Sequence, residues 1–399
     1  MSTVESMSTT ERFLQYVAFD TQSVRESTTA PSAEKELALA AFLVDELKAL
    51  GVEDARIGEG GVVYGSIPAT PGCEANPAIG FIAHMDTSPD APGANARPQI
   101  VRYDGGDVTL NVEKNIVFSV GQFPDILKYK GQDVIFTDGT TLLGAHPEVP
   151  HARLCIGFTP DEEVARGTEN FDIPLFGAAY AYTFDGGEIG TLESENFNAG
   201  TALVTIRGVG VHPGLSKGKM VNSVRYAARL IDRLPIDQAP ETTEGHEGFL
   251  HPNMAKGTVV ESVVRILVRD HDRALYEEKK AFLVKLVDEM SAEFPEAKFS
   301  LEIKDSYENM KPYLDKAPKV LEIVRAAYRA CGMEPQEEPI RGGTDGARLS
   351  VRGLPCPNVF TGGMNFHGVY ECIPVKSLDK GAEVAVMLAK KSAEVTSLQ

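Results

Sequence analysis

The stretch Ala78–Pro89, AIGFIAHMDTSP, decides the fold of this chain. Its mostly apolar residues Ile79–Ile82 run into His84 and Asp86, and Ser88-Pro89 then signals a turn. A short apolar run that ends at turn residues is typical of a buried strand. Residues i and i+2 of a strand point to the same face, so we expect the two polar side chains side by side. Either the carboxylate simply caps its neighbour, or it orients a metal-binding histidine.

Three further apolar runs end in side chains that can bind metals. LCIGF (154–158) is followed by Asp161-Glu162-Glu163, AYAYTF (179–184) by Asp185, and NVFTGGMNF leads to His367. Each has an ordinary explanation alone: an acidic helix start, an Asp-Gly turn and a polar surface histidine. Open α/β sheets, however, bind ligands beyond the carboxyl ends of their strands. Four such strand ends in one sheet therefore predict a metal site.

The residue types in this predicted site suit hydrolysis. Two imidazoles and several carboxylates fit zinc, or manganese and cobalt at a similar site. Two ions ~3.5–4 Å apart would polarise a carbonyl group and lower the pKa of a shared water. Of the adjacent Glu162 and Glu163, one can bind a metal while the other carries the proton from the water to the leaving amine.

The order of predicted elements divides the chain into two domains. In residues 1–200 and 307–399 strands alternate with helices, which predicts an α/β domain with a mostly parallel sheet covered by helices. Residues 201–306 follow the order β-α-β-β-α-β of a ferredoxin-like sandwich. Strands are expected there at 201–207, 257–260, 263–268 and 298–303. We therefore predict a catalytic domain built from both ends of the chain, interrupted by a smaller domain.

Composition excludes some classes of partner. The chain has 399 residues, with 39 Lys and Arg against 57 Asp and Glu, for a net charge of −18. Such an excess of acid argues against nucleic-acid and anionic-membrane partners. The five cysteines form no C-x-x-C pair, and neither a signal peptide nor an apolar run of ~18–20 residues is evident. We expect a cytoplasmic protein.

Six motifs carry a resemblance that covers nearly the whole chain: HMDTSPD, FTPDEEV, TFDGGEIG, VHPGLSKG, PIRGGTDGA and GGMNFHGVYE. They resemble the peptidase T family, the tripeptide aminopeptidases among the co-catalytic zinc peptidases, which also include carboxypeptidase G, dipeptidases and acetylornithine deacetylase. The resemblance implies that Asp86 orients its histidine neighbour and that Glu162 is the general base. It implies two zinc ions per subunit and four metal ligands: His84, Glu163, Asp185 and His367.

The resemblance also gives roles to the smaller domain. It implies a lid that forms a homodimer, with His212 of VHPG reaching the partner's site to bind the oxyanion, although a plain turn residue before Pro213-Gly214 is an alternative. Tripeptide selectivity requires a cation for the substrate carboxylate, and Arg341 is the candidate because Arg binds carboxylates bidentately. A structural surface Arg is an equal alternative. Other functions left open are a related dipeptidase, carboxypeptidase or N-acyl amino-acid deacylase, and a non-catalytic peptide-binding protein.

One expected segment is absent. In the family, an Asp-Asp-Lys-Ala-Gly-like segment follows the strand written here as TLLGA; its first Asp bridges the two metals, and a long helix follows it. Here Ala145 leads directly into His146, at the start of HPEVPH. We also expect Leu142-Leu143 to be the parallel neighbour of the strand at 154–158. A parallel crossover takes a dozen or more residues, and six are too few.

Three explanations of this departure remain open. The segment belongs to the protein but not to this sequence, it was deleted deliberately, or it was lost naturally. We favour the first, because removing a covering helix exposes a large area at ~25 cal/mol per Å². An intact mass well above 43.1 kDa would support it, and agreement with 43.1 kDa would exclude it. Without the bridging carboxylate, the activity of the chain is in doubt.

Overall fold

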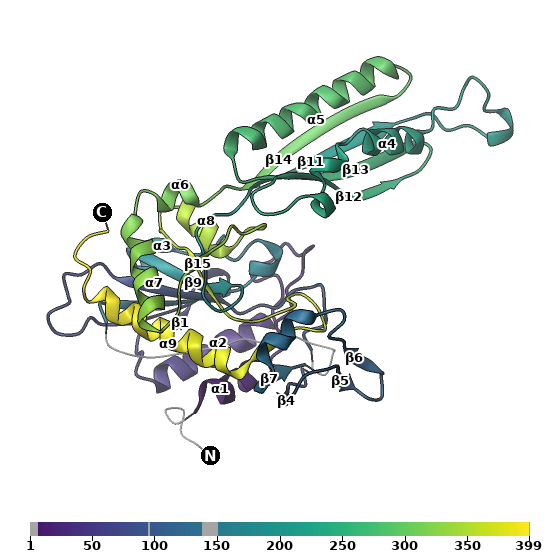
Figure 1. The fold of residues 1–399 in the computed structure, drawn as a ribbon. Helices are drawn as coiled ribbons and strands as arrows, with labels where there is room; N and C mark the ends of the chain where they lie inside the picture. Colours follow the sequence, from purple (N-terminus) through teal and green to yellow (C-terminus); the bar gives the residue numbers. More distant parts are fainter. Residues whose placement is uncertain (1–6, 95, 138–150, 399) are drawn as a thin grey trace. The chain divides into compact units, whose positions relative to one another are not determined.

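The computed structural model describes residues 7–94, 96–137 and 151–398, which form two compact units. Unit 1 comprises the described residues of Met1–Ser194, Pro312–Glu338 and Thr344–Gln399 (Figure 1). Unit 2 comprises Glu195–Lys311 and Pro339–Gly343. The borders fall at 194/195 and 311/312, where the sequence predicts 200/201 and 306/307. The short segment 339–343, which contains Arg341, joins unit 2 and not the part of the chain around it.

Unit 1 is built on an eight-stranded sheet. Its order is β1 (Arg56–Ile57), β2 (Val63–Ile67), β8 (Leu154–Thr159), β3 (Ile79–His84), β9 (Tyr180–Gly186), β16 (Asn358–Phe360), β10 (Thr191–Glu193) and β15 (Gln336–Glu337). The four central strands β8, β3, β9 and β16 are parallel. Antiparallel pairs flank them on both sides. The predicted α/β architecture with a parallel core is confirmed.

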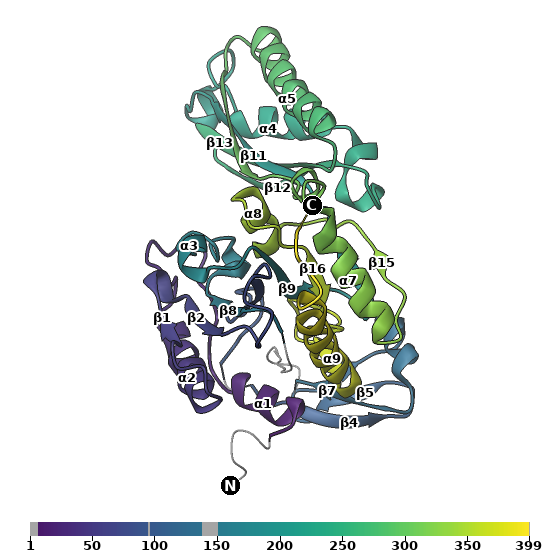
Figure 2. The ribbon, with the colours of Figure 1, turned by 90° about the vertical axis from the view of Figure 1, so that its left-hand side faces the viewer.

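Helices cover both faces of this sheet, because successive residues of one strand pack against different helices. Val63 packs with the apolar side of α2 (Glu36–Ala49), whereas its neighbour Tyr64 packs with α3 (Ile173–Phe176) and α8 (Asp345–Val351). This alternation is the pattern of a strand buried on both faces. Two further helices, α7 (Pro318–Ala330) and α9 (Val375–Ser392), pack against each other (Figure 2). The remaining helix of more than one turn is α1 (Thr9–Tyr16), which contacts α9.

Two small sheets complete unit 1. One has the order β17 (Cys372–Pro374), β7 (Gln132–Phe136), β4 (Gln99–Tyr103), and the other pairs β5 (Val108–Asn111) with β6 (Ile116–Phe118). Tyr103, Phe118 and Phe136 share one buried cluster with Met364, so this region has a core of its own. It joins the segment after β3 to the segment after β16.

The neighbours of β8 differ from the predicted ones. Its parallel partner is β3, from Ile79↔Leu154 to His84↔Thr159, and β2 pairs with its other edge. Both edges of β8 are therefore occupied by strands other than the predicted one, since local sequence does not reveal which distant strand pairs with β8. Leu142-Leu143, for which the sequence predicts the parallel position, lie outside the described residues. The junction of Ala145 and His146 itself lies outside the described residues.

Unit 2 is the predicted β-α-β-β-α-β sandwich. Its order along the chain is β11 (Asn198–Arg207), α4 (Ser223–Asp232), β12 (Phe249–Gly257), β13 (Glu261–Asp270), α5 (Arg273–Glu293) and β14 (Lys298–Tyr307). The sheet order is β12-β13-β11-β14, and its buried face forms one core with α4 and α5. The strand predicted at 257–260 is wrong, because β12 ends at Gly257 and the chain turns there through the Thr258 N to Glu261 O hydrogen bond of 2.8 Å. Within the described ranges of both units, no helix is long and apolar enough to span a membrane.

Candidate metal centre and active site

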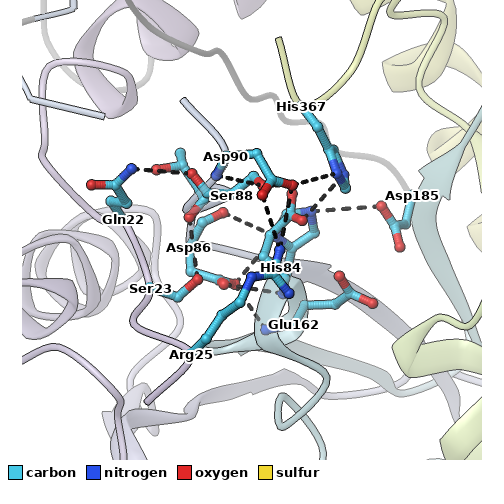
Figure 3. A network of polar contacts seen from close by, with 12 residues as sticks. Gln22, Ser23, Arg25, His84, Asp86, Ser88, Asp90, Glu162, Asp185 and His367 are labelled. Carbon is cyan, nitrogen blue, oxygen red and sulfur yellow. Dashed lines mark hydrogen bonds and ion pairs between the residues drawn. The ribbon is translucent and has the colours of Figure 1, made fainter. Parts of the chain in front are cut away.

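The side chains predicted to bind metals lie at one edge of the unit 1 sheet. Because β8, β3, β9 and β16 are consecutive parallel strands, their carboxyl ends meet there. His84 ends β3, Asp185 lies near the end of β9, and Glu162 and Glu163 follow β8. His367 lies in the loop after β16 (Figure 3). The structure thus brings together five side chains from four separate segments of the sequence.

The four predicted metal ligands form two histidine–carboxylate pairs. His84 Nε2 lies 3.6 Å from Asp185 Oδ1. His367 Nε2 lies 3.1 Å from Glu163 Oε2. Two ligand atoms bound to one tetrahedral zinc ion at roughly 2.1 Å lie roughly 3.4 Å apart. The spacing within each pair therefore fits one ion per pair.

Asp86 connects the two pairs. Its Oδ1 lies 3.3 Å from His84 Nδ1 and accepts a hydrogen bond of 3.0 Å from the backbone N–H of Glu162. Its Oδ2 accepts one of 3.2 Å from the backbone N–H of Glu163. Asp86 is only 3% exposed, so these contacts are shielded from water. His84 Nδ1 also lies 3.0 Å from the backbone oxygen of Asp86, so Asp86 contacts the histidine twice and its carboxylate holds the turn that carries the two glutamates.

That turn and the loop of the second histidine have unusual backbone conformations. Glu162–Val164 form one 3-10 turn between Asp161 (φ 62°) and Ala165 (φ 64°), which are both left-handed. Asn365 (φ 58°) and His367 (φ 62°) are left-handed as well. Left-handed residues other than glycine are uncommon and often gather at functional sites. Asp161 anchors its turn, since both carboxylate oxygens accept hydrogen bonds from Ser32 N, at 3.0 and 2.8 Å.

Negative charge is concentrated at this edge. Burial raises the pKa of Glu162 well above its usual value, and the charges of Asp185 and Asp345 add to the effect. Burial also raises the pKa of Glu163. Burial by itself lowers the pKa of His84, but its contacts with Asp185 and Asp86 outweigh burial and raise the pKa well above 6.5. The raised pKa values mean that bound protons neutralise part of the negative charge of the carboxylates. Bound metal cations would neutralise the same charge if they replaced these protons.

The donor types fit divalent metals, but only in part. Each pair offers one imidazole and one carboxylate, which suits zinc, manganese or cobalt. A catalytic zinc site usually has three protein ligands. Among the described residues, no group of three His, Cys, Asp or Glu side chains is placed to hold one ion. Each described pair therefore offers two of the three protein ligands that such a site usually has.

Two other predicted site residues lie in unit 2. His212 is exposed and begins a 3-10 turn, where its Nδ1 accepts a hydrogen bond of 3.2 Å from Gly214 N. Arg341 donates hydrogen bonds from NH1 to the carbonyl oxygens of Gly245 and Glu247, each at 2.9 Å, and from NH2 to Thr243 Oγ1 at 2.8 Å. Within unit 2, Arg341 thus holds the segment from residue 243 to 247.

Two supporting residues near the site were not predicted. Glu193 Oε1 accepts a hydrogen bond of 3.2 Å from Gly187 N, so it holds the turn that follows Asp185. Burial raises the pKa of Glu193 to about 7. Asp345 is 3% exposed, and burial raises its pKa to about 7 as well. Asp345 stands in the glycine-rich stretch RGGTDGA, whereas the polar surroundings of Glu193 give no sequence signal.

Comparisons with known proteins agree with this architecture. The peptidase dimerisation domain matches residues 194–298, which lie almost entirely in unit 2. Among solved structures, a tripeptidase from Staphylococcus aureus has a TM-score of 0.75 and aminopeptidase PepT from Bacillus cereus one of 0.73. Both are 21% identical, and the matches cover 96% of this chain and 97% and 98% of theirs. A dinuclear metal binding peptidase from the M20 family of Bacillus subtilis has a TM-score of 0.59 at 12% identity, over 96% of this chain and 98% of its own. The chain thus has the fold of peptidases with a dimerisation domain.

Closer relatives define the family. Peptidase T of Desulfitobacterium hafniense is 47% identical over 96% of this chain and 98% of its own length. Peptidase T of Parabacteroides distasonis is 46% identical over 97% and 99%. Similarity of this extent shows that the chain belongs to the peptidase T family, as its motifs predict.

The same comparison bears on the expected absent segment. The match to the D. hafniense protein spans 403 aligned positions but only 96% of the 399 residues here, which is about 383. At about 20 positions the relative therefore has a residue and this chain has none. The comparison does not place these positions, but their number is enough for a short segment such as the one expected after Ala145.

Proposed function

We propose that this protein is a dizinc aminopeptidase that removes the N-terminal residue from tripeptides. The observation that carries the proposal is the pair of histidine–carboxylate contacts at neighbouring strand ends, with Glu162 beside them. Membership of the peptidase T family supports it. The solved structures with this fold, among them an aminopeptidase, a tripeptidase and a dinuclear metal binding peptidase, agree with it.

The proposed roles follow from the contacts. His84 and Asp185 would hold one ion, and His367 and Glu163 the other. Bound there, the ions would polarise the scissile carbonyl and acidify the attacking water. Glu162 takes a proton from that water as its oxygen bonds to the carbonyl carbon. The same carboxyl group then gives the proton to the amine that leaves when the C–N bond breaks.

Two residues of unit 2 complete the proposal. We assign the substrate carboxylate to Arg341, because Nε–H and one N–H of NH2 have no partner among the described residues and a guanidinium has five N–H donors. Arg341→Ala should raise KM for tripeptides far more than for their C-terminal amides, and equal effects would contradict the assignment. Because Arg341 also holds residues 243–247, unfolding of the variant is measured alongside. We assign the oxyanion to His212 of a partner subunit, since its Nε2 has no described partner.

The dimer is proposed through the β14 edge of the unit 2 sheet, which is one of its two free edges among the described strands. Among described strands β14 pairs only with β11, so its other edge is open. Beside it α5 exposes Phe282 (37%) and Val284 (46%), and a hollow of about 460 Å³ lies between α5 and β14. Edge-to-edge pairing would bury these groups. Sedimentation should give a homodimer that Val284→Glu weakens; a monomeric wild type would contradict this.

The compartment proposed is the cytoplasm. All five cysteines are free, which fits a reducing environment. The substrate proposed is a small peptide, with no role for nucleic acid or membrane.

A substrate panel tests the activity. The zinc-loaded protein is given tripeptides, the same tripeptides acetylated at the N-terminus, dipeptides and N-acyl amino acids, and products are identified by mass spectrometry. The expected result is release of the first residue from unblocked tripeptides alone. Faster cleavage of dipeptides or acyl amino acids would favour the related enzymes. No cleavage, together with fewer than two zinc ions per chain, would indicate a peptide-binding protein.

A further inference from the structure

The second nitrogen of each metal-site histidine faces a carboxylate. His84 lies between Asp185 on its Nε2 side and Asp86 on its Nδ1 side. His367 has a similar but looser arrangement, because its Nε2 lies 3.1 Å from Glu163 Oε2 and its Nδ1 lies 3.7 Å from Asp90 Oδ2, which is longer than a hydrogen bond (Figure 3). Metal-binding histidines commonly have their second nitrogen held by a carboxylate, which fixes the orientation of the ring.

Asp90 is held in place by residues other than His367. Arg25 NH2 donates hydrogen bonds to both carboxylate oxygens of Asp90, at 3.2 and 3.3 Å. Ser88 Oγ donates one of 3.1 Å to Oδ2. Gln22 Nε2 donates to the carbonyl oxygens of Ser88 and Ala91, at 3.4 and 2.6 Å, which fixes the loop itself. The carboxylate therefore has a defined position with or without the histidine.

His367 needs such support more than His84 does. Its side chain is 54% exposed, against 23% for that of His84, so packing restrains the ring less. It also lies in a loop with left-handed backbone and not in a strand. A ring in this setting can rotate unless a hydrogen bond fixes it.

We propose that Asp90 is a positioning residue that orients His367 for the second metal ion, as Asp86 does for His84. The proposal rests on the proposed function in that it takes His367 as a metal ligand. The competing explanation is that Asp90 is only the ion-pair partner of Arg25. In that case its loss would leave metal binding unchanged.

Stepwise zinc titration with a chromophoric competitor tests the role of Asp90 without measuring hydrolysis. Asp90→Ala should weaken the second zinc step about tenfold, at the low end of the usual range for such residues, and leave the first step unchanged. Asp90→Asn should recover most of the loss, because its amide oxygen can accept a hydrogen bond from Nδ1–H once the metal-bound ring closes the 3.7 Å gap. The matched control is Asp133→Ala, since Asp133 pairs with Arg102 at 3.5 Å and its side chain is 51% exposed, against 50% for Asp90.

Three outcomes would overturn the proposal: two unchanged steps in Asp90→Ala, equal weakening of both steps, or a wild-type chain that binds fewer than two zinc ions. Thermal unfolding of each variant shows that it is folded, and Asp90→Asn serves if the alanine variant is not. A protein that shows the expected zinc steps but does not cleave tripeptides would contradict the proposed function and leave the role of Asp90 intact.

Discussion

The two halves of the candidate metal centre are built differently. His84 and Asp185 belong to β3 and β9, which are paired parallel neighbours, so the sheet itself sets the distance between them. His367 and Glu163 come from a loop and a 3-10 turn, next to left-handed residues. The first half is therefore preorganised by the fold, whereas the second depends on supporting carboxylates. We expect the first half to bind metal more tightly.

The largest effect on activity should come from a variant that leaves both histidine–carboxylate pairs intact. Glu162→Gln removes the proposed base but keeps the backbone N–H at this position, which donates a hydrogen bond to Asp86. Loss of a general base typically lowers kcat by about 10²–10⁴-fold, so we expect a loss in that range on tripeptides. Zinc content, measured on the same sample, should remain that of the wild type. A variant with near-normal kcat would exclude Glu162 as the base.

Asp86→Ala should disturb the two halves together. It leaves His84 without its orienting carboxylate and leaves the N–H groups of Glu162 and Glu163 unpaired. We expect both zinc affinities to fall up to about 100-fold. Competitive zinc titration gives the two constants. If only one step weakened, Asp86 would serve a single half and the connection drawn between them would be wrong.

In the metal-free protein, the buried carboxyl groups should make the free energy of unfolding depend on pH. The pKa of Asp345 is raised from 3.8 to about 7 by burial, so the folded protein holds this proton more tightly than the unfolded chain. The resulting stability is fully present below about pH 3.8 and is lost as the pH rises towards 7. We expect the free energy of unfolding to fall by up to about 4 kcal/mol over this range, since the pKa shift is about three units and one unit corresponds to about 1.4 kcal/mol.

Asp345→Asn, which cannot titrate, isolates this contribution. Urea unfolding of the metal-free variant and wild type at several pH values should give a flatter curve for the variant between pH 4 and 7. Only the slopes are compared, because a buried amide changes absolute stability for other reasons. Parallel curves would show that Asp345 is not the group responsible.

The smallest effect should come from Glu193, which supports the strand-built half. Glu193→Ala removes the acceptor for Gly187 N beside Asp185. If β9 already fixes Asp185, the first zinc step should weaken less than tenfold, and Glu193→Gln should behave as wild type. A loss as large as that of Asp86→Ala would show that β9 does not fix Asp185 without Glu193.

Much of the site could be predicted from the sequence, because the residues that define it end apolar strands. His84, Asp185 and the adjacent glutamates were found in this way, and parallel strands bring their ends to one edge. Sheet order could not be found, since it depends on long-range packing, and so β3 was missed as the neighbour of β8. In unit 2 the strand β12 was misplaced. Pro252 interrupts its pattern at a register shift, which an edge strand tolerates.

Supporting residues were harder to predict. Asp90 belongs to the HMDTSPD motif but acts on His367, which lies far along the chain. Glu193 likewise contacts Gly187 through a turn that the sequence does not specify. Such contacts depend on side-chain distances across the fold, and no local pattern records them.

We propose that the two histidine–carboxylate pairs are two metal sites of unequal affinity. Stepwise zinc titration of the wild type, Asp185→Ala and Glu163→Ala tests it most directly. We predict two zinc ions per wild-type chain, with the tighter step lost in Asp185→Ala and the weaker step lost in Glu163→Ala. Fewer than two ions, or the reverse assignment of the steps, would contradict it.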